Sequence, residues 1–228
     1  IAQGTLWKME EIFQLSVELY DTKENKVLWS DRWQESWDNL TNIKVNLSDG
    51  LLKALDTNPK EKQIETNNPK AYEYYLKGLD IYRVRKNKDD FDSAKELIEK
   101  SIEIDNDFYP AIILLNNIYV TEGNIDKAEK LLIKLIEKSA INNNKRALAR
   151  SYYSYADIYR LKADVSSAIH FMIKALNIYQ NINNKEFIIK CYSSLVAFSI
   201  MIGNYTEAMD YTKKSISMLK NIGDKLSL

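Results

Sequence analysis

The chain has 228 residues, of which 45% are hydrophobic and 28% charged, and its 32 Lys and Arg residues balance its 32 Asp and Glu residues. This composition is typical of a globular protein and excludes wholesale disorder. A net charge of zero lacks the broad positive field that holds nonspecific nucleic-acid or anionic-membrane ligands, so we expect neither nucleic acid nor a membrane surface as a partner. No apolar run approaches the ~20 residues that a membrane-spanning helix needs.

One cysteine, Cys191, and one histidine, His170, exclude an internal disulfide framework and metal centres built from several cysteines or histidines. We expect Cys191 to be a structural thiol and His170 a surface or partly packed helix residue. The acidic residues 105–107 lack the glycine and distal glutamate of a calcium loop. We therefore expect no metal, no other cofactor and no catalytic residue. The start at Ile1 indicates a piece of a longer protein.

The first 55 residues alternate in the manner of strands. Phe13, Leu15, Val17 and Leu19 fall on one face of an expected strand over residues 11–21. A polar turn at 22–26 leads to a partner strand at 27–33, and residues 2–7 predict an earlier strand. Apolar residues then recur at three and four positions from 40 to 55, which predicts an amphipathic helix interrupted at Gly50. All four tryptophans lie in this region, at positions 7, 29, 33 and 37. We expect Trp29 and Trp33, on the hairpin, to belong to a core or to a face that a missing half of the domain covers, rather than to a ligand site.

From Pro69 onward the sequence predicts pairs of antiparallel helices that repeat. Alanines recur at positions 94, 128, 168 and 208, glycine–asparagine pairs at 123 and 203, and an Asn or Asp before Lys at 144, 184 and 224. Small residues at the helix crossing follow the same register, at Gly78, Asn116, Ala156 and Val196. Such pairs must stack, because one pair cannot bury its apolar stripe. The spacing of 40 in the later repeats predicts long loops at 139–145 and 181–186.

This register resembles the tetratricopeptide repeat. The residues that carry the resemblance in the second repeat are Ile112, Leu115, Asn116, Tyr119, Gly123, Asn124 and Ala128, and those in the third are Tyr152, Tyr155, Ala156, Tyr159 and Ala168. The resemblance implies a mainly α fold, a right-handed α-solenoid of about four repeats over residues 70–228 with a truncated fifth at 224–228. It also implies a noncatalytic module for protein–protein interaction.

The front segment resembles a TolB-like (FlgO- and CsgG-related) domain. The residues that carry this resemblance are Leu28-Trp29-Ser30 in the hairpin and Tyr75-Leu76-Lys77-Gly78 at the start of the array. It implies a partial α/β segment at 1–55, a linker at 56–69, and a bacterial signalling protein with an adenylate or guanylate cyclase domain upstream. The alternative is a winged-helix transcriptional activator. A cytoplasmic location is the default, although the related activators carry this region outside the inner membrane.

The concave face of such an array is built from the first helix of each pair and is the expected binding surface for a protein or peptide. Tyrosine and arginine are favoured where binding energy concentrates. By register, we expect this face to carry Tyr75, Tyr82, Arg83, Asn117, Arg150, Tyr153, Asp157, Arg160 and Lys190. A Lys–Asn clamp for a terminal carboxylate is not expected, because Ile113 stands where the lysine belongs. The edge of an incomplete sheet and an uncapped last repeat predict a homodimer.

Overall fold

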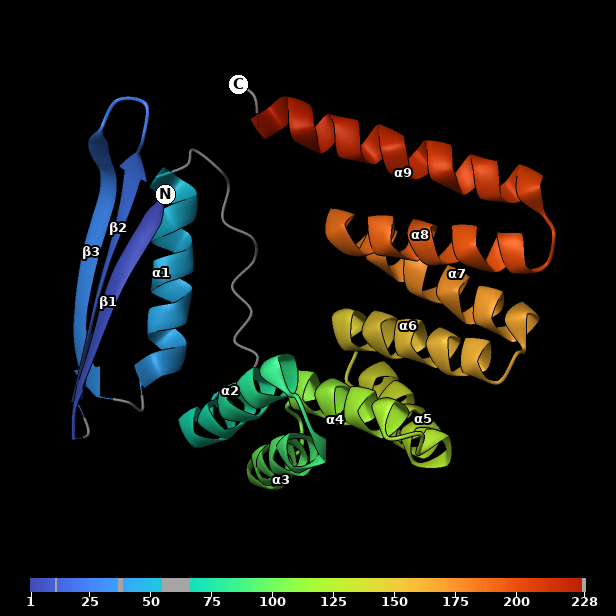
Figure 1. Cartoon of the computed structure of the whole chain (residues 1–228), viewed down its shortest axis with the longest axis horizontal. Coiled ribbons are helices and arrows are strands. Elements are labelled where there is room, and N and C mark those ends of the chain that lie inside the picture. The colour runs from blue at the N-terminus through green and yellow to red at the C-terminus, as the bar shows by residue number, and fades with distance from the viewer. Residues whose placement is uncertain (11, 37–38, 55–65, 227–228) are drawn as a thin grey trace. The chain divides into compact units, whose positions relative to one another are not determined.

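The computed structural model describes residues 1–10, 12–36, 39–54 and 66–226. It begins with an antiparallel sheet in the order β1 (Ala2–Met9), β2 (Ile12–Asp21) and β3 (Lys26–Ser36), followed by α1 (Leu40–Ala54) (Figure 1). The predicted hairpin, earlier strand and helix are confirmed, and both outer strands extend beyond their predicted ends.

The predicted alternation along β2 agrees with the burial of its side chains. Phe13, Val17 and Leu19 are buried, whereas the polar residues between them remain partly open to solvent. The strand register places Trp29 opposite Leu19 and Trp33 opposite Leu15. Because cross-strand partners share a face, both tryptophans lie on the apolar side of the sheet.

The sequence pattern suggested an interruption at Gly50, but α1 continues through this residue. The glycine instead allows α1 to approach β3. A Cβ atom on Gly50 would lie 2.5 Å from Cζ2 of Trp29, closer than any side chain tolerates. The glycine therefore makes room for the indole ring. Trp7 lies on the opposite face of the sheet and is 67% exposed; Trp37 lies outside the described residues.

β1 forms one edge of the sheet, and each of its residues is exposed. An edge strand carries backbone donors and acceptors that can pair with another strand. The homodimer expected through this edge stays a prediction. Residues 55–65, which hold most of the expected linker, lie outside the described residues.

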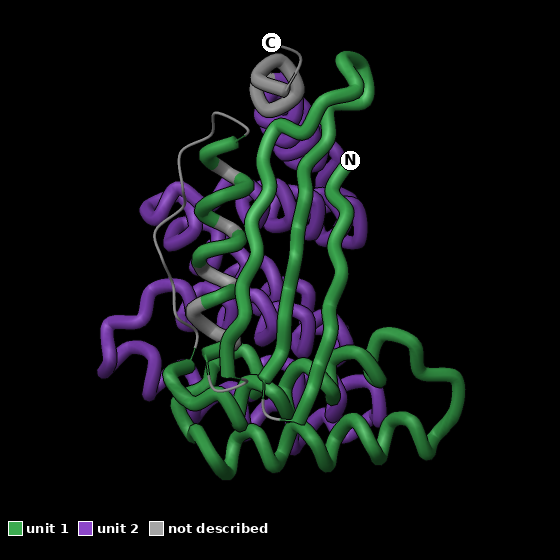
Figure 2. Tube along the Cα trace, turned by 90° about the vertical axis from the view of Figure 1, so that its left-hand side faces the viewer, with its two compact units in different colours: residues 1–111 green, residues 112–228 purple. Residues whose placement is uncertain are grey.

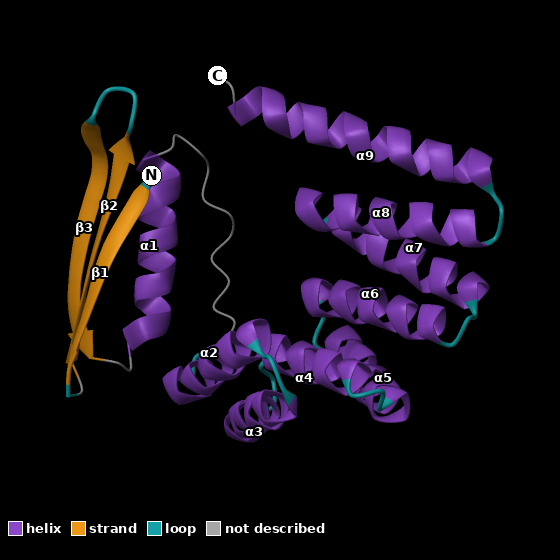
Figure 3. Cartoon of the chain, viewed as in Figure 1, coloured by secondary structure: helices purple, strands orange, loops and turns teal. Residues whose placement is uncertain are grey.

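The rest of the described chain is helical (Figure 3). The helices after α1 are α2 (Pro69–Val84), α3 (Lys88–Ile104), α4 (Tyr109–Thr121), α5 (Ile125–Ile141), α6 (Lys145–Leu161), α7 (Val165–Asn181), α8 (Lys185–Met201) and α9 (Tyr205–Leu226). Side chains cap several of them: Asn144, Asp164 and Asn184 each accept a hydrogen bond from the backbone N–H three residues on. These caps satisfy amides that a helix leaves unpaired at its start. None of the described helices has the length and apolar composition needed to cross a membrane.

The breaks between helices are short, which corrects the prediction of long loops at 139–145 and 181–186. Helices α5 to α8 have 17 residues each, and only residues 142–144, 162–164, 182–184 and 202–204 separate α5 to α9. The 40-residue spacing therefore comes from longer helices.

From α4 to α9, each break contains one residue with positive φ, at positions 123, 143, 163, 183 and 203. The N–H of the following residue donates to the carbonyl five residues earlier, as in Asn184 to Tyr179 at 2.9 Å. This left-handed closure is the usual end of a helix that must reverse. The sequence marked only Gly123 and Gly203, because Asn143, Ala163 and Asn183 take the same conformation without being glycine.

The alanines that define the repeat are buried, as predicted. Ala94, Ala128 and Ala168 are 0% exposed and Ala208 is 6% exposed. Gly78 marks a helix crossing, because a Cβ atom there would lie 2.8 Å from Cδ1 of Ile98 and 3.0 Å from the Ala94 carbonyl oxygen. Small residues thus set the close approach of α2 and α3.

The chain divides into two units, residues 1–111 and 112–228 (Figure 2). The boundary falls inside the predicted array, and the predicted domains stay a prediction. In the second unit α5 packs on α6, α6 on α7, α7 on α8 and α8 on α9. No new helix begins at Asp224 among the described residues, where a truncated repeat was expected: α9 continues to Leu226.

Candidate functional site

The second unit brings four of the expected binding residues together on α6. Arg150, Tyr153 and Asp157 are half-buried and Arg160 is exposed. The Arg160 Nε lies 3.4 Å from Asp157 Oδ1. Burial raises the pKa of the Asp157 carboxyl, and the charges of Arg160 and Arg150 oppose that rise.

Two aromatic rings flank the Arg150 guanidinium. Its Cζ atom lies 5.6 Å from the ring centre of Tyr153 and 5.0 Å from that of Phe187, which projects from the first turn of α8. Contacts between a guanidinium and aromatic rings at this range are attractive. The Tyr153 hydroxyl lies 3.2 Å from the Ser194 Oγ on α8. The side chains of α6 and α8 thus form one connected surface.

Lys190 completes this surface. Its Nζ lies 4.6 Å from the Phe187 ring centre and 2.7 Å from the Glu186 carboxylate one turn earlier. We call this set the α6–α8 cluster; its members are Arg150, Tyr153, Phe187, Lys190 and Ser194. Of these, the sequence predicted Arg150, Tyr153 and Lys190.

Sequence reasoning missed Phe187 and Ser194, and it missed Tyr179 beside them. Phe187 lies three residues before Lys190, on the same helix face, and that spacing was the available signal. Tyr179 comes from the second helix α7, which the register of first helices ignores. Its ring stacks on Phe187 with the centres 4.8 Å apart and the planes 17° apart.

The other predicted residues do not join the cluster. Tyr75 packs edge-on against Phe108 at 4.9 Å between ring centres, and Tyr82 lies beneath the Arg85 guanidinium at 3.8 Å. Both belong to the first unit, as does the exposed Arg83. Asn117 on α4 is half-buried, and among the described residues no polar contact joins its side chain to the cluster. Ile113 is buried.

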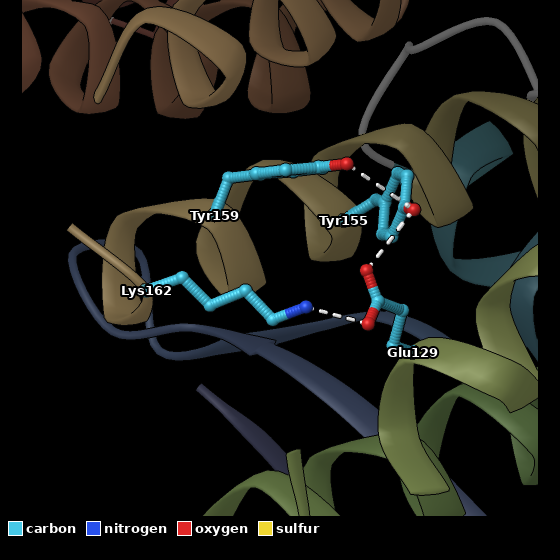
Figure 4. Close-up of polar contacts among 4 residues, drawn as sticks. All are labelled: Glu129, Tyr155, Tyr159 and Lys162. Atoms are coloured by element: carbon cyan, nitrogen blue, oxygen red, sulfur yellow. Dashed lines mark hydrogen bonds and ion pairs between the residues drawn. The ribbon is translucent and has the colours of Figure 1, made fainter. Parts of the chain in front are cut away.

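A second polar group on α5 and α6 has a structural role (Figure 4). The Glu129 carboxylate accepts hydrogen bonds from the Tyr155 hydroxyl at 3.3 Å and from Lys162 Nζ at 2.5 Å. The Tyr159 hydroxyl donates to that of Tyr155, and the Tyr159 ring stacks on Phe171 of α7 with the centres 5.3 Å apart. These contacts connect the second helix of one repeat to the first helix of the next.

Among the described residues, neither Cys191 nor His170 lies in an arrangement typical of a catalytic or metal-binding group. Cys191 is fully buried, and burial raises the pKa of its thiol to about 12, so it remains protonated and unreactive near neutral pH. His170 is exposed and meets the edge of Phe171. The described residues hold no group of three or more His, Cys, Asp or Glu suited to a metal. Asp105 instead accepts a hydrogen bond from the Thr66 hydroxyl.

Antiparallel helix pairs joined by short turns at regular intervals define an α-solenoid of helical repeats. Models of the tetratricopeptide repeat match residues 88–149 and 149–182. The chain therefore contains tetratricopeptide repeats, as the sequence predicted. A comparison with curated proteins found no match.

Solved structures show the same fold at low sequence identity. BtubC from P. vanneervenii is 16% identical with a TM-score of 0.59, over 82% of this chain and 76% of that one. A Rap protein complexed with Competence and Sporulation Factor is 14% identical with a TM-score of 0.61, over 82% and 51%. A Signal Transduction ATPase with Numerous Domains from Pyrococcus horikoshii, with a tetratricopeptide repeat sensor, is 18% identical with a TM-score of 0.63, over 82% and 29%. This chain thus spans about half of the Rap protein and under a third of the ATPase.

Proposed function

We propose that this chain binds an extended peptide segment of a partner protein on the α6–α8 cluster and performs no chemistry itself. The observation that carries the proposal is the gathering of a guanidinium, two aromatic rings and an ammonium group on successive first helices. Arginine and aromatic residues are enriched where binding energy concentrates. Tetratricopeptide repeats, matched over residues 88–182, generally serve protein interaction.

The structurally similar proteins support a role in signalling. The Rap protein was solved with Competence and Sporulation Factor bound, and the repeats of the Pyrococcus ATPase are described as a sensor. We extend this role to the whole protein as the regulatory C-terminal part of a bacterial adenylate or guanylate cyclase, because the front segment resembles a TolB-like domain. A winged-helix transcriptional activator is the alternative. Sequencing the gene upstream of Ile1 distinguishes the two.

Selection of peptides with the full chain tests the binding proposal. A displayed library of extended peptides is selected against the chain, and affinities of the selected peptides are measured by calorimetry. Tyr153→Ala and Arg150→Ala should each weaken binding about tenfold, the usual effect of removing a residue where binding energy concentrates. The matched control is Tyr205→Ala, which removes a 66% exposed tyrosine from the second helix α9. Failure to select any peptide, or equal binding by all four proteins, contradicts the proposal.

A further inference from the structure

Arg150 holds a positive charge that the protein does not neutralise by direct contact. Its guanidinium lies over Tyr153 and Phe187, and among the described residues it has no hydrogen bond or ion pair. The nearby carboxylates are engaged elsewhere: Asp157 pairs with Arg160 and Glu186 pairs with Lys190. A guanidinium presents five N–H donors in a planar fork that fits a carboxylate. Those donors remain available to a ligand.

Tyr179 supplies a second unused donor at the same place. The residue is 1% exposed, and its hydroxyl has no hydrogen-bond partner among the described residues. A buried polar group without a partner destabilises a fold and calls for an explanation. The Tyr179 ring stacks on Phe187 with 4.8 Å between the ring centres, and the Arg150 Cζ atom lies 5.0 Å from the centre of the same Phe187 ring. Phe187 therefore connects the tyrosine to the guanidinium.

The electrostatic balance around these two donors is positive. Arg146 lies one helical turn before Arg150 and is exposed, and it has no ion-pair partner among the described residues. The unpaired Tyr179 hydroxyl and the unpaired guanidinium groups of Arg150 and Arg146 would all be stabilised by a ligand that carries negatively charged acceptor atoms. Arg150, Tyr153 and Phe187 each keep part of their surface open, whereas the Tyr179 hydroxyl is buried. Binding at this hydroxyl therefore requires a side-chain rotation of the kind that commonly accompanies complex formation.

We propose that Arg150 and the Tyr179 hydroxyl form a subsite for the carboxylate of a partner peptide, with Tyr153 and Phe187 holding the guanidinium in place. This inference rests on the proposed function and specifies its ligand: an extended peptide with an acidic residue at the position that meets α6 and α8. The carboxylate has two sources, an Asp or Glu side chain or a free carboxyl terminus. Both present the same pair of acceptor oxygens.

Three versions of a selected peptide separate these sources. The first carries Glu at the contact position, the second carries Gln there, and both have acetylated and amidated ends; the third carries Gln with a free carboxyl terminus. Fluorescence anisotropy with the full chain should show the Glu peptide binding about tenfold or more tighter than the Gln peptide, as expected for a charge-assisted hydrogen bond. Equal or tighter binding of the third peptide identifies the terminal carboxylate as the group that is bound.

Substitutions then identify the two donors. Arg150→Lys keeps the positive charge but loses the planar set of N–H donors. It should weaken binding of the favoured carboxylate peptide and leave the affinity for the Gln peptide with blocked ends unchanged. Tyr179→Phe should weaken the same peptide several-fold without lowering the melting temperature of the free chain, because it removes a buried hydroxyl that has no partner. A purely structural tyrosine would not show this combination.

Two variants serve as controls. Tyr192→Phe removes a hydroxyl that accepts a hydrogen bond from Gln180, and Lys134→Gln removes an exposed charge from α5. Neither should alter the preference for a carboxylate. Tyr153-dependent binding without any such preference, or a preference that survives Arg150→Lys and Tyr179→Phe, overturns the subsite but leaves the proposed function standing. Absence of binding by every peptide overturns both.

Discussion

At the scale of single residues, Asn116 shows how the repeat tolerates an unfavourable side chain. It occupies the crossing position of α4, is 1% exposed, and its Oδ1 has no hydrogen-bond partner among the described residues. The equivalent residue of α6 is Ala156, which is 0% exposed. Asn116→Ala should therefore stabilise the chain by about 1 kcal/mol, because an unpaired buried amide costs more than the small packing loss.

Urea unfolding followed by circular dichroism measures this change. The reciprocal substitution Ala156→Asn is the matched control and should destabilise the chain, because it places an unpaired amide at the equivalent crossing. A lower free energy of unfolding for Asn116→Ala would show that the amide contributes favourable packing that its unpaired oxygen does not outweigh.

The residues expected on the binding face mark the limit of what a repeat register can predict. The register places Arg150, Tyr153 and Lys190 on first helices, and the structure joins their side chains through Phe187 and Ser194. It cannot predict Tyr179, because that ring reaches Phe187 from a second helix. Nor does it predict that Tyr82 packs edge-on against Phe91 of α3, with 6.1 Å between the ring centres. Contacts between helices depend on side-chain reach, which spacing alone does not specify.

At the scale of helices and breaks, the backbone conformation of Ala163 carries a measurable cost. Ala163 has φ of 61° at the turn between α6 and α7, where Gly203 has φ of 74° between α8 and α9. A left-handed conformation costs an L-residue about 1 kcal/mol, but glycine adopts it freely. Ala163→Gly should stabilise the chain by about 1 kcal/mol, whereas Gly203→Ala should destabilise it by a similar amount.

Thermal unfolding of the two variants checks this pair of opposite shifts. A Cβ atom at Gly203 meets no heavy atom within 4 Å, and Ala163 is exposed, so neither change disturbs packing. Shifts of the same sign in both variants would contradict a backbone origin.

The same turns explain which parts of the fold could be predicted. Apolar periodicity and the recurring small residues predicted that the array consists of helix pairs, because each helix buries one stripe. Loop lengths could not be predicted, since the sequence marks a left-handed residue clearly only when it is glycine, as at Gly123 and Gly203. Asn143, Ala163 and Asn183 take that conformation because the packed helices on either side require a reversal there. Tertiary packing therefore outweighs a local preference of about 1 kcal/mol.

At the scale of the whole molecule, three buried groups make stability depend on alkaline pH. Burial raises the pKa of the Cys191 thiol to about 12 and also raises the pKa values of the Tyr155 and Tyr179 hydroxyls. In the unfolded chain these groups ionise with their ordinary pKa values, about 8.5 for a thiol and about 10 for a phenol. The folded chain thus binds more protons than the unfolded chain above about pH 8.5.

Because each folded pKa is raised, the stabilisation is fully present below the unfolded pKa and declines as the pH rises toward the folded value. The free energy of unfolding should therefore fall steadily above about pH 8.5. Urea titrations at a series of pH values measure the slope, and Tyr179→Phe should reduce it above about pH 10, where the unfolded phenol ionises. The matched control is Tyr205→Phe, which removes the hydroxyl of a residue that is 66% exposed and should leave the slope unchanged. An unchanged slope in Tyr179→Phe, or an equal reduction in both variants, would mean that the buried hydroxyl of α7 does not couple proton binding to folding.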